Sequence, residues 1–312
     1  MAESKTAVMA ALLGNGALAV MKGVAAASTG SAAMLAETFH SIADTGNQAL
    51  LFLGMRLSER PPTRAHRFGH GKEVYFWAFV VSVILFSLGG AFSIWEGVQK
   101  LQHESHQEGS RWWSYAVLAG SFVFESISLA VGLRALAHAR GDQTLRRYWR
   151  DNRDPTLPTV ILDDTAALLS LGVAVTGIWL SQVTGSPLWD ACASALIGLL
   201  LVGVAMVLAR ENYSLLIGEA APAAVEAKIR GLVGDDADVV EVLDLRTMHL
   251  GPEDILVALG VRFREDLTTP QIETAIVRIQ EAIRKALHGA TNASLILIEP
   301  VRAGLPEGEG TG

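Results

Sequence analysis

Six long apolar stretches constrain the fold of this chain more than any other feature of its sequence. Each is long enough for a helix that crosses a bilayer, which takes roughly 20 residues. We expect these spans near residues 7–28, 32–55, 74–101, 112–139, 158–183 and 187–211. Half of the residues are hydrophobic and 18% are charged, as in membrane proteins with several spans. The net charge of −7 argues against a nucleic-acid partner. The apolar stretches make the lipid bilayer the expected environment.

Positively charged residues gather in two of the connections between these stretches. Residues 56–72 hold five Lys and Arg and residues 134–153 hold six, whereas the connection at 185–186 holds none. Loops rich in Lys and Arg stay on the cytoplasmic side of a membrane. Because the number of spans is even, both termini are then cytoplasmic. We expect an integral protein of the inner or plasma membrane, with a transmembrane domain over residues 1–211.

The remainder of the chain has the pattern of a small α+β domain. A helix is expected at 222–233, strands at 239–248 and 255–263, a helix at 269–287 and a last strand at 294–301. This α-β-β-α-β order predicts a ferredoxin-like cytoplasmic domain over residues 212–302. A domain this small has a thin core and often dimerises, so we expect a homodimer. Residues 303–312 are rich in Gly and Glu and predict a disordered tail.

Ionisable residues within the apolar stretches are the main candidates for a functional site. Such residues cost about 2.5–3.5 kcal/mol each at the centre of a span. His40 and Asp44 are four residues apart, so they share one face of a helix, and Asp163 and Asp164 lie in the fifth stretch. Nitrogen and oxygen ligands without sulfur suit zinc, while manganese, cobalt and iron stay open. The alternative is that these residues cap helices or satisfy one another.

Three further residues are candidates for an accessory role. Glu125 lies in the middle of the fourth stretch, where it would serve as a proton carrier or an additional ligand. His66 and His70 lie four residues apart before the third stretch. They would hold a second cation, or else belong to a basic surface loop that only sets the topology.

Several segments together resemble the cation diffusion facilitator family of divalent-metal transporters. They are AETFHSIAD at residues 36–44, RFGHGK at 67–72, Leu215-Leu216 after the sixth stretch, and the α-β-β-α-β tail. The resemblance runs nearly end to end. It implies a homodimer that exchanges a divalent metal for protons, with a transport site formed by a ligand-x-x-x-Asp motif in each of the second and fifth spans.

The fifth stretch departs from the family pattern. Position 160, where the family has a ligand, is Val. The run LDDTAALL at 162–169 is similar instead to the zinc-transporter-nine-like branch, in which an acid beside the span-five Asp accompanies the missing ligand. Asp163 lies about 100° around the helix from Asp164, so shared coordination needs a distortion or a water. The resemblance therefore implies a site of His40, Asp44 and Asp164, with Asp163 beside it.

Two departures outside the spans bear on other sites. The family's Asp ahead of the loop histidines corresponds to Thr63, and the tail lacks the family's histidine cluster, so we expect no tightly held metal there. The family also pairs a lysine at the mouth of span three with an acid near the start of the tail. Lys72 and Glu219 would form this charge interlock here, although Gly218 occupies the expected acidic position. The alternative is two solvated charges.

The pattern predicts a secondary transporter of divalent transition-metal cations, most simply zinc efflux coupled to proton antiport. Metal and protons compete for the same deprotonated ligands, and an imidazole such as His40 exchanges a proton near neutral pH. The cation is the substrate, and no resident cofactor is expected. Alternatives are a manganese, iron or cobalt transporter of the same family, an intramembrane zinc enzyme, and a membrane scaffold that does not transport. The sequence lacks the His-Glu-x-x-His motif of zinc proteases, which argues against an enzyme.

Overall fold

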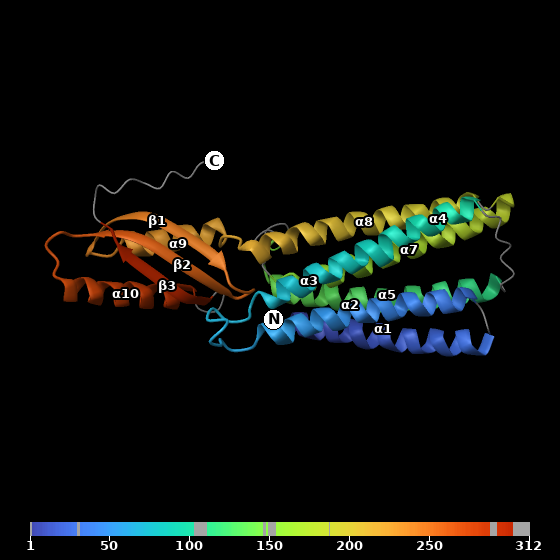
Figure 1. The fold of residues 1–312 in the computed structure, drawn as a ribbon, viewed down its shortest axis with the longest axis horizontal. Coiled ribbons are helices and arrows are strands. Elements are labelled where there is room, and N and C mark those ends of the chain that lie inside the picture. Colours follow the sequence, from blue (N-terminus) through green and yellow to red (C-terminus); the bar gives the residue numbers. More distant parts are fainter. Residues whose placement is uncertain are drawn as a thin grey trace. The chain divides into compact units, whose positions relative to one another are not determined.

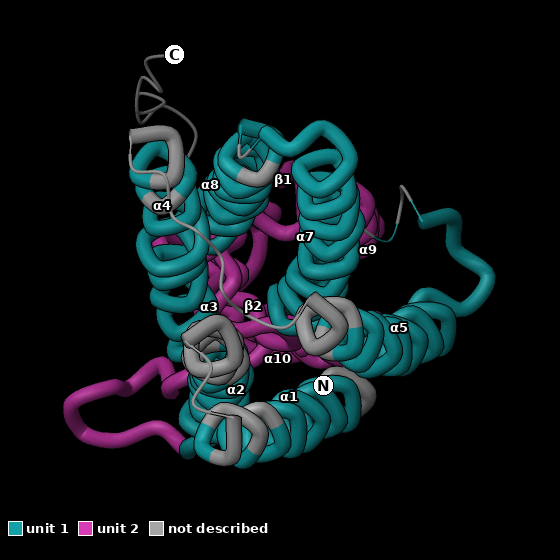
Figure 2. The backbone as a smooth tube through the Cα atoms, turned by 90° about the vertical axis from the view of Figure 1, so that its right-hand side faces the viewer, with its two compact units in different colours: residues 1–60, 72–214 teal, residues 61–71, 215–312 magenta. Residues whose placement is uncertain are grey.

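The computed structural model divides the chain into two compact units (Figure 2). The membrane unit consists of residues 1–60 and 72–214, and the tail unit consists of residues 61–71 and 215–312. The structure describes residues 2–29, 32–102, 111–145, 148, 154–186, 188–287 and 292–301. The expected disordered tail at 303–312 lies outside these residues. The division of the chain at residue 211 stays a prediction, and the loop 61–71 groups with the tail.

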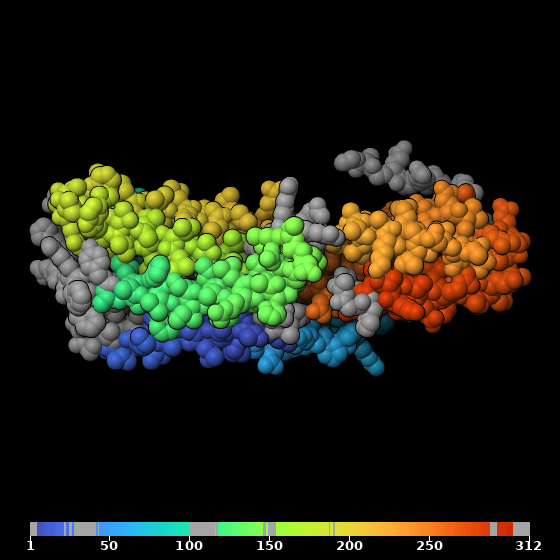
Figure 3. Space-filling model, turned by 180° about the vertical axis from the view of Figure 1, so that it is seen from behind, coloured from blue at the N-terminus to red at the C-terminus, as the bar shows by residue number. Residues whose placement is uncertain are grey.

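The membrane unit is a bundle of long helices (Figure 1). They are α1 (Ala2–Thr29), α2 (Ala32–Ser58), α3 (Glu73–Ile84), the π-helix η1 (Leu85–Ala91), α4 (Phe92–Gln102), α5 (Arg111–Arg140), α7 (Thr156–Thr184) and α8 (Leu188–Ile217). Seen from behind, α5 lies between α7 and α1 on one face of this unit (Figure 3). Apolar side chains predominate in most of these helices, as a bilayer requires.

Within the described part, four helical segments are long and apolar enough to cross a membrane. They are Glu73–Gln99, Leu118–Arg140, Thr156–Thr184 and Ala191–Ile217, and a shorter apolar helical stretch covers Lys5–Met21. This finding confirms a helical membrane protein. The helix α2 is interrupted by polar residues, among them Asp44 and Gln48, and the count of six spans stays a prediction.

Glycines bring the third span unusually close to α8. A Cβ atom on Gly198 of α8 would lie 2.5 Å from Ile94 Cγ1 and 2.7 Å from the Gly90 carbonyl oxygen. Gly90 belongs to the π-helical turn η1, a distortion that the apolar pattern of the sequence does not predict. Small residues permit such backbone approach between helices in lipid, where packing rather than hydrophobic burial drives association.

The tail unit contains α9 (Ala223–Gly234), β1 (Val239–His249), β2 (Asp254–Phe263), α10 (Thr269–Leu287) and β3 (Asn292–Pro300). The order is the expected α-β-β-α-β, and every end lies within two residues of its predicted position. The sheet has the order β1-β2-β3, with β1 antiparallel and β3 parallel to β2. The ferredoxin-like assignment stays a prediction.

The core of the tail unit lies between one face of this sheet and its two helices. Alternate residues of β2 are buried, from Ile255 to Phe263, as expected for a strand with one covered face. They pack against Ile229 and Val233 of α9 and against a buried stripe of α10 that includes Ile279 and Ile283. Burial of this aliphatic surface is the main stabilising contribution of the unit.

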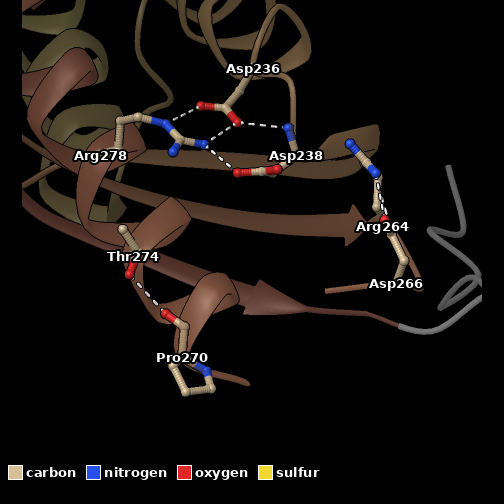
Figure 4. A network of polar contacts seen from close by, with 7 residues as sticks. All are labelled: Asp236, Asp238, Arg264, Asp266, Pro270, Thr274 and Arg278. Atoms are coloured by element: carbon tan, nitrogen blue, oxygen red, sulfur yellow. Dashed lines mark hydrogen bonds and ion pairs between the residues drawn. The ribbon is translucent and has the colours of Figure 1, made fainter. Parts of the chain in front are cut away.

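An ion cluster fastens α10 to the start of β1. The Arg278 guanidinium donates to both carboxylate oxygens of Asp236, at 2.9 and 2.7 Å, and to Asp238 at 2.8 Å (Figure 4). The hydrogen bonds from Arg278 lower the pKa of the Asp236 carboxyl below its usual range. Bidentate pairing of this kind is stronger than a single neutral hydrogen bond, so the cluster helps to hold helix and sheet together.

The loop 61–71 contacts the tail through backbone atoms. A Cβ atom on Gly71 would lie 2.4 Å from the Leu250 carbonyl oxygen, and one on Gly251 would lie 3.1 Å from Gly71 Cα. Both glycines are therefore required for the approach of the loop to the β1–β2 turn. Gly71 is bonded to Lys72, which directly precedes α3, so the chain passes from this contact straight into the third span.

Candidate metal site

Asp164 is the most deeply buried acidic residue that the sequence singled out. Its side chain is 2% exposed in α7. The helix begins eight residues earlier, where the Thr156 amide donates to the Asp154 side chain at 3.0 Å. In the part of the chain that the structure describes, Asp164 Oδ2 accepts no hydrogen bond. A buried carboxylate oxygen without a donor is costly, and a bound cation or proton would offset that cost.

Acidic side chains from two other helices lie near Asp164. Glu125 of α5 and Asp44 of α2 are both close enough for their charges to act on it, and the Ser128 hydroxyl faces it from α5. Neither the Ser128 hydroxyl nor Asp164 Oδ2 has a hydrogen-bond partner of ordinary geometry among the described atoms. Glu125 is 8% exposed. Charges from α2 and α5 therefore act on the buried carboxyl of α7, and a bound cation would relieve this repulsion between like charges.

The other predicted residues of the site differ in what the structure says of them. Asp163 is half-buried and has its own interaction partner. Val160 is 1% exposed and offers no donor atom. The side chain of His40 lies outside the described part. Among the side chains that are described, no three His, Cys, Asp or Glu groups lie at metal-ligand spacing, so the predicted ligand set stays a prediction.

The sequence reading missed Ser128. It is three residues after Glu125, a spacing that places both side chains on the same face of α5. This spacing was the signal in the sequence that could have identified Ser128. A serine in an apolar span carries little information by itself, however, because small polar residues are common in membrane helices.

The two loop histidines lie against each other. The ring centroids of His66 and His70 are 4.6 Å apart at an angle of 46°. The Thr63 hydroxyl, at the position where the family has an acid, accepts a hydrogen bond from the His66 amide at 3.1 Å. This residue therefore stabilises the turn of the loop. The two rings form a pair, and a cation bound there would need further ligands.

Lys72 and Glu219 belong to different units. Each has an interaction partner, and the Glu219 carbonyl accepts a hydrogen bond from the His249 amide at 2.9 Å. His249 is buried, with its Nδ1 atom 3.3 Å from the Gly251 carbonyl oxygen. The backbone of Glu219 thus supports the end of β1, while the charge interlock with Lys72 stays a prediction.

Apolar helices with a buried acidic residue, Asp164, on which acidic residues of two other helices act, are typical of a membrane protein that handles cations within the bilayer. Comparison with known proteins identifies the family. Residues 8–217 match the cation efflux transmembrane domain, and the chain belongs to the cation efflux family. This match confirms the resemblance seen in the sequence, and it supports a transporter rather than an enzyme.

Named relatives refine the position of the chain within the family. It is 35% identical over 247 residues to the mitochondrial proton-coupled zinc antiporter SLC30A9 of Mus musculus, covering 78% of this chain and 43% of that protein. It is 33% identical over 228 residues to metal tolerance protein C4 of Arabidopsis thaliana, covering 72% and 50%. Magnetosome protein MamM of Paramagnetospirillum magneticum is 26% identical over 272 residues, covering 86% and 80%. The chain spans about half the length of the first two relatives.

Proposed function

We propose that this protein is a secondary transporter of divalent transition-metal cations that exports zinc in exchange for protons. The observation that carries the proposal is the almost complete burial of Asp164, whose Oδ2 atom accepts no hydrogen bond among the described residues and on which the charges of Glu125 and Asp44 act. The similarity to a relative named as a proton-coupled zinc antiporter supports zinc and protons as the exchanged ions. Zinc is named for that relative, and a flux experiment tests whether this chain moves it.

The chemistry of the buried carboxylates suits exchange. A carboxylate inside a membrane is costly when it is charged and alone, so a cation or a proton would stabilise Asp164, whose Oδ2 atom has no hydrogen-bond partner among the described residues. Divalent metal binds the deprotonated form and releases protons when it does so. His40 and Asp44 on α2, with Asp164 on α7, would hold the metal. Glu125 lies beside them and would receive a released proton, and alternating exposure of this centre to the two sides would complete the cycle.

The proposal includes an architecture finer than the family match supplies. It comprises six spans, both termini in the cytoplasm, and a homodimer formed through a ferredoxin-like tail. The two basic loops support the topology. The thin core of the tail unit supports dimerisation. Sedimentation of the segment 212–312 would test the dimer, and an obligate monomer would remove this part of the proposal.

Flux in proteoliposomes tests the function itself. We expect purified protein to move zinc into vesicles that contain a zinc-sensitive dye, faster when the vesicle interior is acidic, with proton movement in the opposite direction. Competing manganese, cobalt and ferrous iron rank the substrates. Zinc movement that does not depend on the proton gradient would contradict antiport. The absence of any metal movement, with correctly folded protein in the vesicles, would contradict transport.

A further inference from the structure

Gln48 of α2 is a fully buried amide, and it plays no part in the site described above. Its side chain is 0% exposed. Neither Nε2 nor Oε1 has a hydrogen-bond partner in the part of the chain that the structure describes. Native proteins leave few buried polar groups in this condition, and each such group calls for a water, an ion or another explanation. The oxygen of the neighbouring Asn47, which is 4% exposed, is in the same condition.

The position of Gln48 relates it to the acidic residues. It lies four residues after Asp44, so it shares a face of α2 with Asp44 and is one helical turn further along. The charge of Asp44 acts on Asp164 of α7. The face of α2 that carries Gln48 is therefore the face that looks toward the acidic residues.

The residue one turn before Asp164 on α7 is apolar. Helices α2 and α7 run in opposite directions through the bundle (Figure 1). One turn beyond Asp44 on α2 thus corresponds to one turn before Asp164 on α7, which is Val160. Val160 is buried and apolar. Val160 therefore offers no donor atom from α7 one turn away from Asp164.

We propose that the Gln48 amide oxygen is a neutral ligand of the transported cation, directly or through one water, on the Val160 side of Asp44. The inference rests on the proposed function. Oxygen donors of amides and carboxylates both bind divalent cations. An amide does not ionise at physiological pH, so Gln48 would add to metal affinity without adding to the protons released.

Zinc titration of the purified full chain in lipid nanodiscs tests this role. Gln48→Leu is close in volume and removes both polar ends. We expect zinc affinity to fall by about 10-fold, in line with the loss of a supporting metal contact, while the number of protons released per zinc stays unchanged. If the amide had only a structural role, the apolar variant would be neutral or stabilising, and unchanged affinity would overturn the proposal.

A control and a second variant complete the experiment. Asn212 of α8 is another buried amide with an unpartnered oxygen among the described atoms, and Asn212→Leu should leave zinc affinity unchanged. An equal loss in that variant would assign the effect to general destabilisation and overturn the proposal. Gln48→Glu retains an oxygen and adds charge, so it should bind zinc at least several-fold more tightly; weaker or unchanged binding would overturn the proposal even if Gln48→Leu does not fold. A wild-type chain that binds no zinc would instead contradict the proposed function.

Discussion

The two units of this molecule treat buried polar groups in opposite ways. In the membrane unit, several buried side chains have a polar atom without a hydrogen-bond partner among the described residues. They are Asn47, Gln48, Ser121, Ser128, Thr156, Asp164, Ser170 and Asn212. In the tail unit, side chains in partly buried positions are paired. Thr247 donates to Glu226 at 2.6 Å, and Gln280 donates to the Ile296 carbonyl at 3.0 Å.

This difference indicates what each unit is built for. Unpaired groups inside a protein cost stability, and they persist where another species completes them. The unpaired groups of the membrane unit include Asp164 and Gln48, both candidates for contact with a cation. The tail uses its polar groups to fasten helices to strands. We therefore expect polar substitutions in the membrane unit to change transport more than stability, and those in the tail to do the reverse.

The largest expected effect is on transport, from loss of the buried carboxylate of α7. Asp164→Asn keeps the shape of the side chain and removes its charge. Zinc flux in proteoliposomes should fall by at least about 100-fold, because even residues that only support metal ligands are worth about 10–100-fold. Thermal stability should be unchanged or higher, since the variant no longer buries a charge.

Asp163→Asn is the matched control for this variant. Asp163 is half-buried and lies about 100° around the helix from Asp164, so it should lose much less flux. Equal losses of flux would show that Asp163 contributes as much as Asp164, and the preference for Asp164 would be wrong. On the same reasoning, His40→Ala and Asp44→Ala should each abolish flux while membrane insertion stays intact, and wild-type flux in either would exclude it from the site.

Next in size is a packing effect that concerns the membrane unit alone. Gly198→Ala places a Cβ atom within 2.7 Å of the Gly90 carbonyl oxygen, so α8 and the third span must move apart. We expect the unfolding free energy to fall by about 1–3 kcal/mol, as for other overpacked sites. Gly203→Ala is the control on the same helix, because a Cβ atom there meets nothing within 4 Å. Thermal denaturation in detergent measures both variants, and equal stability would argue against close packing at Gly198.

A smaller effect tests the paired polar groups of the tail. Asp236→Asn should lower the unfolding free energy of the segment 212–312 by about 0.5–1 kcal/mol at neutral pH, because Arg278 is half-exposed and the pair is screened. The folded pKa of Asp236 is lowered. Its contribution is therefore complete above the unfolded value of about 3.9 and is lost as the pH falls through the lower folded value. Chemical unfolding followed by circular dichroism between neutral and acidic pH measures the change.

The control for Asp236 is the exposed pair of Arg264 and Asp266. These residues are two apart and their closest contact is 2.5 Å, so much of the pair persists in the unfolded chain. Asp266→Asn should leave the stability and its acid dependence nearly unchanged. If both variants lose the acid-dependent part equally, Asp236 has no special role in joining α10 to β1. Zinc flux of the full chain should be close to wild type in both.

The tail was predictable from sequence because its signals are local. Alternate apolar residues in β2 and the apolar stripe of α10 each reveal the buried face of one element. Four apolar helices long enough to cross a membrane could be located for the same reason. The described part of α1 holds only a shorter apolar stretch and α2 is interrupted by polar residues, so the number of spans stays a prediction. The π-turn η1 and the close approach of Gly90 to Gly198, more than a hundred residues later, leave no pattern in the apolar stretch that would predict them.

The same distinction between local signals and contacts of distant residues applies to the candidate site. The spacing of His40 and Asp44, and the preference for Asp164 over Asp163, follow from the geometry of single helices and still await a test of metal binding. The placement of Glu125 beside Asp164 depends on how α5 packs against α7, which no spacing reveals. The grouping of loop 61–71 with the tail depends on the contact of Gly71 with Leu250, a backbone approach that leaves no pattern in side-chain chemistry.

The smallest expected effect concerns the link between the two units. Lys72 precedes α3 and Glu219 follows α8, so a charge interlock between them would join the membrane unit to the tail. If the pair is solvated, it contributes roughly 0–1 kcal/mol. If it is partly buried at a dimer interface, loss of one partner leaves the other charge uncompensated and costs more. Lys72→Glu should then weaken the dimer or slow zinc flux.

A charge exchange decides between these two cases. Adding Glu219→Lys to Lys72→Glu should restore part of the lost dimer stability, because the opposite charges face each other again with their positions reversed. Independent residues would instead give the sum of the two single effects. That sum would show that Lys72 only sets the topology, as one of the positive charges that keep its loop on the cytoplasmic side. The loop would then be tied to the tail by the Gly71 contact rather than by charge.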